Sequence, residues 1–285
     1  MIQSMTGYGK TVLQLPTKKI TIELKSLNSK NLDLNVRIPA YYREKELDIR
    51  KKLASALVRG KVDFSIYIEN NGVELSSKIN ENVVKEYMNQ LRTIVDSDEI
   101  ELLKMAVKLP DSLKTEREEL DEQEWIQIDE AISETVLEIN KYRSDEGAVL
   151  LADFEFRISN IEKLLQKVIE IDPDRMEQVK EKLKKGIAEL EVKIDQNRFE
   201  QELIYYIEKL DITEEKVRLK NHLDYFNKAL KSEDSNGKKL GFITQELGRE
   251  INTIGSKSNF APMQKLVVQM KDELEKIKEQ NLNVL

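Results

Sequence analysis

A long stretch without helix-breaking residues constrains this fold more than any other feature of the sequence. Between Pro110 and Pro173 there is no proline and a single glycine, Gly147. The stretch is highly charged, and its apolar residues recur with helical spacing, which predicts a long helix over roughly 121–171. Aspartates flank Pro173, so we expect a turn there and a second helix at about 174–194. The pattern therefore predicts a long helical hairpin.

The N-terminal residues have the pattern of a sheet with one packed helix. Four segments alternate apolar and polar residues, which is the period of half-buried strands. These segments are 10–15, 18–28, 32–38 and 61–70. Residues 41–58 have helical spacing instead and are followed by Gly60, a residue that commonly ends helices. We therefore predict an α+β domain over residues 1–71, with an antiparallel sheet and a helix packed on it.

The rest of the chain has helical patterns throughout. Residues 72–110 contain short helical segments, which together with the long hairpin form an acidic helical region that we place at 72–197. Residues 198–285 contain no strand pattern and are predicted to form a helical C-terminal domain. The predicted fold class is therefore α+β, with an N-terminal antiparallel sheet, a long helical hairpin in the middle and an all-helical C-terminal domain.

Composition and charge exclude several functional classes. The chain has no cysteine, which excludes disulfides and thiolate zinc sites and fits a cytoplasmic location. No apolar run is long enough for a membrane span, and the first residues lack the apolar core of a signal peptide. The net charge is −7, but residues 1–71 carry +6 and residues 72–197 carry −13. The N-terminal domain could face a polyanion, although a solvated acidic connector between ordinary domains explains the same distribution.

The helix expected around residues 242–259 has an unusual composition. Its glycines, Gly241, Gly248 and Gly255, recur every seven residues and share one side. Glycine costs a helix interior about 1 kcal/mol relative to alanine, so a bare face needs a reason. We expect close packing against another helix, or close approach by a ligand backbone, with a helix cap as an alternative for Gly255. The core stripe of this helix is Leu240, Ile243, Leu247, Ile251 and Ile254.

A polar stripe beside that core holds two carboxylates, Glu246 and Glu250, and the preceding helix holds the only histidine, His222. If the two helices pack antiparallel across their short loop, the imidazole comes near both carboxylates. Such a group suits Mg²⁺ or Mn²⁺, and it also suits acid–base chemistry, since imidazole titrates near neutral pH. The alternative is a surface histidine beside ordinary ion pairs, Glu246–Arg249 and Glu250–Lys257.

Six segments form a distinctive set, and they occur in a fixed order along the chain. They are "SMTGYGK", "IELKSLNSKNLDL", "LVRGKVDFSI", "YRSDEGAVLLADF", "KLDITEEKVRLKNHLDYF" and "GKKLGFITQELGREINTIGSKSN". Together they closely resemble the bacterial YicC/YloC family, from end to end and most specifically in the last segment. The resemblance implies an endoribonuclease that depends on a divalent metal and forms a hexameric ring or clamshell that admits RNA. A homohexamer would also cover the apolar stripe of the long helical hairpin.

We therefore predict metal-assisted hydrolysis of RNA. Glu246 and Glu250 would hold Mn²⁺ or Mg²⁺, and His222 would be a third ligand or a general acid. Basic and polar side chains from both ends of the chain would bind the RNA. These are Lys25, Lys30, Arg37, Arg59, Lys61, Arg218, Arg249, Asn252 and Lys257.

Three alternative functions fit the same residues. The first is a non-catalytic RNA-binding adaptor that recruits or modulates other ribonucleases, with other RNA-decay proteins as partners. The second is an oligomeric scaffold that binds no RNA. The third is a nuclease without a metal, in which His222 and a carboxylate act as acid and base.

Overall fold

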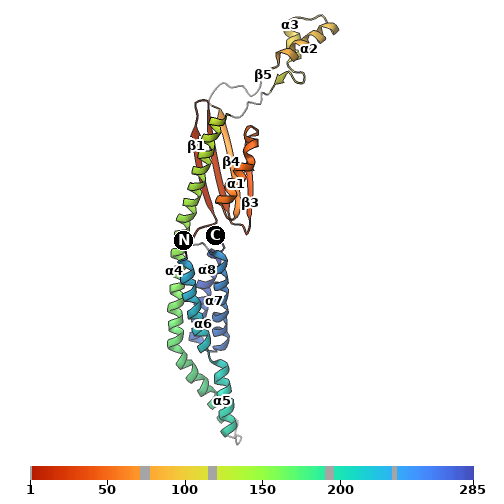
Figure 1. Cartoon of the computed structure of the whole chain (residues 1–285). Helices are drawn as coiled ribbons and strands as arrows, with labels where there is room; N and C mark the ends of the chain where they lie inside the picture. The colour runs from red at the N-terminus through yellow and green to blue at the C-terminus, as the bar shows by residue number, and fades with distance from the viewer. Residues whose placement is uncertain (1, 71–77, 115–120, 190–195, 233–235) are drawn as a thin grey trace.

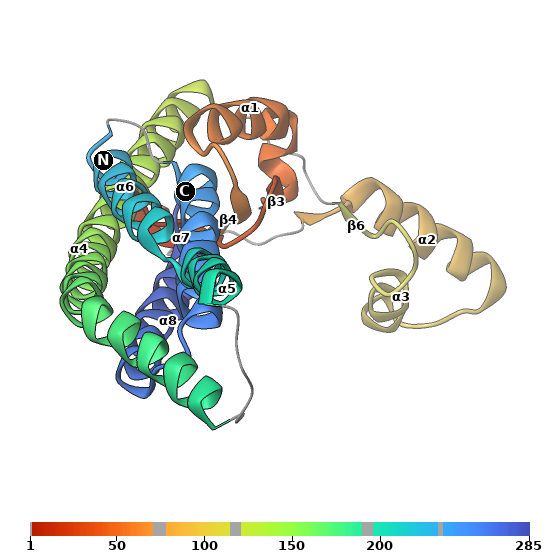
Figure 2. The same cartoon turned by 90° about the horizontal axis from the view of Figure 1, so that it is seen from below.

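The computed structural model describes residues 2–70, 78–114, 121–189, 196–232 and 236–285. Figure 1 shows a four-stranded sheet in one half of the molecule, a helical bundle in the other, and α4 (Glu122–Ala188) running past both. A small separate unit contains α2 (Glu81–Ile94), α3 (Glu99–Ala106), β5 (Lys78–Ile79) and β6 (Leu113–Lys114). Figure 2 shows the same division from below. The predicted α+β class is confirmed.

The order of strands in the N-terminal sheet is β1 (Gly7–Gln14), β2 (Lys18–Leu27), β4 (Gly60–Asn70) and β3 (Leu32–Arg37). β2 is antiparallel to both of its neighbours, but β3 is parallel to β4, which differs from the predicted antiparallel sheet. The connection explains the difference. A short 3-10 helix (Ala40–Lys45) and α1 (Glu46–Ala56) return the chain to the end of the sheet where β3 began, and such a crossover makes neighbouring strands parallel.

One face of this sheet packs against α1 and α4 and forms the core of the N-terminal half. Alternate residues of β2, such as Ile20, Ile22 and Leu24, are fully buried there. β1 approaches α4 through glycine, since a Cβ on Gly9 would lie 2.5 Å from the backbone oxygen of Thr135. The opposite face carries exposed charged residues such as Lys25 and Lys61.

The predicted turn at Pro173 is wrong, because α4 continues through this proline. A proline inside a helix removes one hydrogen bond and bends the helix, but it does not end a helix that is held on both sides. Buried contacts hold it here: Arg175 Nε donates to Asp172 Oδ1 at 2.7 Å, and Lys216 Nζ lies 2.7 Å from Asp172 Oδ2. Figure 1 shows α4 curving in this part. The last residues of the predicted second helix, 190–194, lie outside the described residues.

The helical half consists of the C-terminal part of α4 with α5 (Gln196–Leu210), α6 (Thr213–Leu230), α7 (Gly237–Lys257) and α8 (Ala261–Asn281). The predicted core stripe of α7 is confirmed. All five of its residues are buried: Leu240, Ile243, Leu247, Ile251 and Ile254.

The glycine face of α7 packs against α8, which confirms the prediction of close helix packing. A Cβ on Gly248 would lie 3.3 Å from Leu274 Cδ2, and a Cβ on Gly255 would lie 3.0 Å from Val267 Cγ1. The absence of side chains therefore lets the two helices approach closely. α7 continues past Gly255 to Lys257, so the alternative of a glycine cap is wrong.

The C-terminal residues join the two halves of the molecule. The backbone of Met5 donates a hydrogen bond to the Asn283 oxygen at 2.8 Å. Arg59, just before β4, donates to the Val284 oxygen at 2.5 Å, and burial lowers the pKa of its guanidinium. The structure therefore places Arg59 in this junction and not on an open surface where RNA was expected to meet it.

Candidate metal centre

The apolar stripes of α6 and α7 orient the polar residues of both helices. Leu219, Leu223 and Phe226 are fully buried on α6, as the stripe of α7 is. The two helices run antiparallel, because Lys239 at the start of α7 lies over Tyr225 near the end of α6. With their cores fixed in this way, polar residues of both helices come together on one side of the helix pair.

This side of the helix pair brings together the three residues predicted to hold a metal. One ligand atom from each of His222, Glu246 and Glu250 lies within 4.8 Å of the others. Glu250 is only 4% exposed, whereas His222 and Glu246 are half-buried. The predicted convergence of the imidazole with both carboxylates is therefore confirmed.

None of these three side chains has a hydrogen-bond or ion-pair partner among the residues that the structure describes. Two neighbouring ionised carboxylates repel each other. A cation between them would remove this repulsion. The donor set of two carboxylates and one imidazole suits Mn²⁺ or Mg²⁺, with the remaining positions left for water or a phosphate oxygen. The residues present therefore fit the metal that the sequence predicts.

The ion pairs of the alternative interpretation are not found among the described residues. Lys257 pairs with Glu215 of α6 at 2.7 Å and donates to the Asp211 backbone oxygen at 2.9 Å. Glu250 lies two helical turns away, about 10 Å along the axis, which is too far for a pair with Lys257. Arg249 is exposed, and no ion pair with Glu246 is found among the described residues. Lys257 is thus already neutralised, which weakens its predicted role as a phosphate ligand.

The other predicted RNA-binding residues of the helical half are exposed to solvent. Arg218 is exposed and pairs with Glu214 at 2.5 Å, one turn earlier on α6. Arg249 and Asn252 are exposed on α7. These side chains are accessible to a polyanion that reaches the cluster.

The predicted basic residues of the sheet half are not beside the cluster. Lys25, Lys30, Arg37 and Lys61 are all exposed, but they lie on the sheet or its loops, and Figure 1 places the sheet and the helices α6 and α7 in different halves of the molecule. Lys25 also forms a 3.2 Å pair with Glu23. One chain alone therefore does not gather all the predicted RNA-binding residues around the cluster.

Two aromatic side chains at the cluster were missed in the sequence. Tyr225 follows His222 by one turn of α6, and Phe242 precedes Glu246 by one turn of α7. Both are exposed, and Lys239 Nζ lies 5.0 Å from the centroid of the Tyr225 ring. Their spacing from the three ligands was a usable signal, because residues three or four apart share a helix face.

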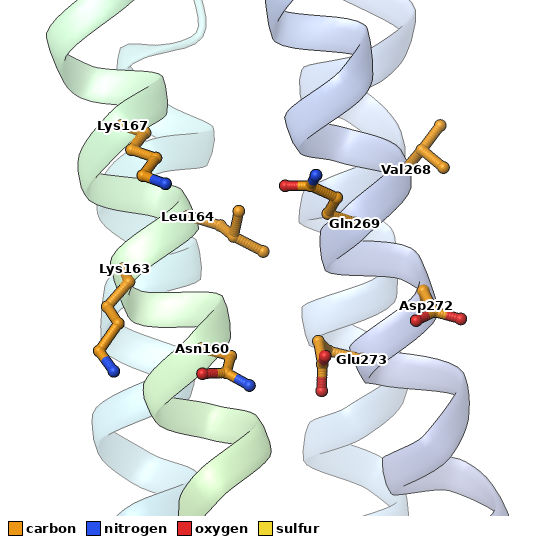
Figure 3. A pocket seen from close by; sticks show the side chains of 8 residues that line it. All are labelled: Asn160, Lys163, Leu164, Lys167, Val268, Gln269, Asp272 and Glu273. Carbon is orange, nitrogen blue, oxygen red and sulfur yellow. The ribbon is translucent and has the colours of Figure 1, made fainter.

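A cleft of about 500 Å³ lies away from the cluster, between α4 and α8. Figure 3 shows Leu164 of α4 and Gln269 of α8 pointing into this space. Its charged residues have mixed sign, with Lys167 on one wall and Glu273 on the other, and Glu273 already pairs with Arg157 at 3.1 Å. The residues that line the cleft form no group of converging ligands, so the α6–α7 cluster is the candidate site.

Comparison with known proteins gives the family. Residues 2–152 match the model of the endoribonuclease YicC-like N-terminal region, and residues 168–285 match that of the endoribonuclease YicC-like C-terminal region. This chain belongs to the YicC-like family. The three residues of the cluster all lie in the part that matches the YicC-like C-terminal model.

Curated relatives match the chain over its full length. A protein named "Probable endoribonuclease YicC" from Clostridioides difficile is 33% identical over 293 aligned residues, with 100% of both chains covered. A protein of the same name from Haemophilus influenzae is 28% identical, again with full coverage of both. Within the described parts of the YicC-like chain, no helix is both long enough and apolar enough to span a membrane.

Proposed function

We propose that this protein is an endoribonuclease that hydrolyses RNA phosphodiester bonds with the help of a divalent metal held by His222, Glu246 and Glu250. The observation that carries the proposal is the convergence of these three side chains, none of which has another partner among the described residues. The names of the full-length relatives support an RNA substrate. The cluster supports metal assistance, because its donor set matches hard divalent cations.

The residues of the cluster have different roles, which follow from how deeply each side chain is buried. Bound Mn²⁺ or Mg²⁺ would supply Lewis-acid stabilisation of the phosphate charge and an activated oxygen nucleophile. Glu250, which is buried, gives the site a fixed ligand, while the more open Glu246 and His222 border the side from which RNA arrives. His222 either completes the ligand set or donates a proton to the leaving oxygen. Arg218 and Arg249 bind the flanking phosphates through charge-assisted hydrogen bonds.

Removing the metal tests this proposal. Purified protein treated with EDTA should lose cleavage of a hairpin RNA with unpaired tails, and Mn²⁺ or Mg²⁺ added back in excess should restore it, because the uncompensated carboxylates repel the phosphate. Cleavage is followed on denaturing gels with end-labelled RNA. Undiminished cleavage in EDTA would favour the metal-free acid–base mechanism. No cleavage with any divalent metal, together with tight RNA binding, would favour the adaptor function.

We also propose that the protein forms a homohexamer. Large apolar side chains such as Leu137, Val149 and Phe156 are exposed along α4, and an assembly that covers them would be stabilised. Such an assembly could bring basic sheet residues of one chain, such as Lys25 and Lys61, to the metal cluster of another. A cytoplasmic location and contacts with other RNA-decay proteins belong to the same proposal.

Light scattering measures this directly. We expect a mass about six times the 33.2 kDa of one chain at micromolar concentration. Added salt should not dissociate the assembly, since its contacts are apolar. A mass of one chain over the whole concentration range would contradict the hexamer and leave the cluster as the RNA site of a monomer.

A further inference from the structure

The small unit formed by α2, α3, β5 and β6 buries few of its own apolar residues. Within residues 78–114, the buried apolar side chains are Val84, Leu102 and Ala106. A larger set of apolar side chains is exposed: Ile79, Ile94, Val95, Ile100, Leu103, Met105, Leu109 and Leu113. Units of fewer than about 40 residues rarely bury enough surface to be stable alone. The small unit therefore has an apolar surface that a partner would stabilise.

Much of this surface lies on α3, which is apolar on two sides. Leu102 and Ala106 are buried on the first side. Ile100, Leu103 and Val107 are spaced by three and four residues, so they share a second side of the helix. Ile100 is 61% exposed and Leu103 is 44% exposed. The second side of α3 is therefore uncovered in one chain.

The opposite end of the molecule also contains helices without a core. The last turns of α4 and all of α5 project beyond the bundle as an arm, which we define as residues 176–189 and 198–210. Among the arm side chains that the structure describes, none is buried. On α5, Ile204 is 57% exposed and Tyr205 is 59% exposed. The arm is therefore a second apolar surface without cover.

The two surfaces carry opposite charge. Residues 96–101, at the start of α3, contain four acidic residues and no basic one, whereas residues 180–185 of α4 contain four lysines and one glutamate. Neither these lysines nor Asp96 and Asp98 form an ion pair with a described residue. Two copies of either surface would repel each other, whereas one of each would attract. Charge therefore favours a contact between unlike surfaces.

One chain alone cannot bring the two surfaces together, because Figure 1 shows α3 and α5 at opposite ends of the molecule. We propose that the second side of α3 docks on the arm of a neighbouring copy of this chain, with residues 96–101 facing residues 180–185. Such a head-to-tail contact can repeat around a closed ring, where it covers both surfaces of every chain. The inference rests on the proposed homohexamer, because it names two surfaces through which its chains meet.

Disulfide linkage tests this contact directly. The chain has no cysteine, so a disulfide forms only between cysteines that are introduced. Mild oxidation of full-length Leu103→Cys with Ile204→Cys should link the chains into a ladder that extends beyond the dimer on a non-reducing gel. Each single variant should stay unlinked, since its thiol faces a surface without one. Leu103→Cys with Val268→Cys is the matched control and should also stay unlinked, because Val268 is an exposed apolar residue of α8 outside the arm.

Charge reversal tests which surfaces meet. Lys182→Glu with Lys185→Glu, added to the double-cysteine protein, should lower the linked fraction at least about fivefold, because two acidic runs then face each other. Asp96→Lys with Asp98→Lys should have the same effect. All four reversals together should restore the ladder, and misfolding cannot produce such a rescue.

The results separate this inference from the proposed homohexamer. A mass of six chains by light scattering without a ladder would refute the docking and leave the hexamer standing. A ladder in a protein of any other mass would support the docking and refute the hexamer. Linked dimers of either single variant would show that like surfaces meet and would overturn the inference. Weaker RNA binding by Lys182→Glu with Lys185→Glu, together with an unchanged ladder, would assign these lysines to RNA and would also overturn it.

Discussion

Replacing both carboxylates of the cluster, as Glu246→Gln with Glu250→Gln, should reduce RNA cleavage at least about a thousandfold while RNA binding is retained. Glutamine keeps the size of the side chain but removes the charge that holds a divalent cation. RNA binding should stay equal or become tighter, because two negative charges near a polyanion have been removed. Cleavage is measured as a single-turnover rate with saturating protein, and affinity by filter binding.

A matched control exists on the neighbouring helix. Glu275 and Glu279 of α8 are also four residues apart and are exposed, so Glu275→Gln with Glu279→Gln removes the same charge at the same spacing. The control should cut RNA at the unmodified rate. In EDTA, the cluster variant should melt at the same temperature as the unmodified protein or higher, since the two neighbouring carboxylates no longer repel each other. Equal loss of cleavage in both variants would contradict a specific role for the cluster.

The second large effect concerns Gly147, the single glycine between Pro110 and Pro173. A Cβ on Gly147 would overlap the backbone oxygen of Ile2 and lie 2.8 Å from its carbonyl carbon. The N-terminal segment is fixed at this crossing, since Ser4 N donates to the Arg143 oxygen at 3.0 Å. The backbone cannot rotate away as a side chain can, so we expect Gly147→Ala to destabilise the protein by about 2 kcal/mol or more.

A glycine-to-alanine substitution elsewhere in α4 should change the stability of the protein in the opposite direction. A Cβ on Gly186 would meet no atom within 4 Å, so Gly186→Ala should stabilise the protein by about 0.5–1 kcal/mol through helix propensity alone. Both variants are compared by the urea concentration at the midpoint of unfolding. Stabilisation by Gly147→Ala would mean that residues 2–4 do not pack across α4 in solution.

Local patterns in the sequence predicted the elements but not how the chain connects them. Alternation in β2 and helical spacing in α4 were sufficient to find both, because each depends on neighbouring residues. The parallel pairing of β3 with β4 depends on where α1 returns the chain, which no strand pattern contains. The continuity of α4 through Pro173 depends on Lys216, which is distant in sequence and pairs with Asp172.

The candidate site shows the same limit. The cluster was predictable because the core stripes of α6 and α7 determine which way His222, Glu246 and Glu250 point. The partner of Lys257 was not predictable from the sequence. Its pair with Glu215 depends on how α6 and α7 align along their length. Phe242 lies on the same helix face as Glu246, so the spacing alone places it beside the cluster. It carries no charge, and charge was the property that pointed to the other site residues.

Mn²⁺ binding to the metal-free protein tests the central claim most directly. Electron paramagnetic resonance of free Mn²⁺ gives the number of ions bound without any need for RNA or turnover. We expect one tightly bound ion per chain, lost in His222→Ala and in Glu246→Gln with Glu250→Gln, and kept in Glu275→Gln with Glu279→Gln. An unmodified protein that binds no ion, or a cluster variant that binds Mn²⁺ as well as the unmodified protein does, would contradict the account.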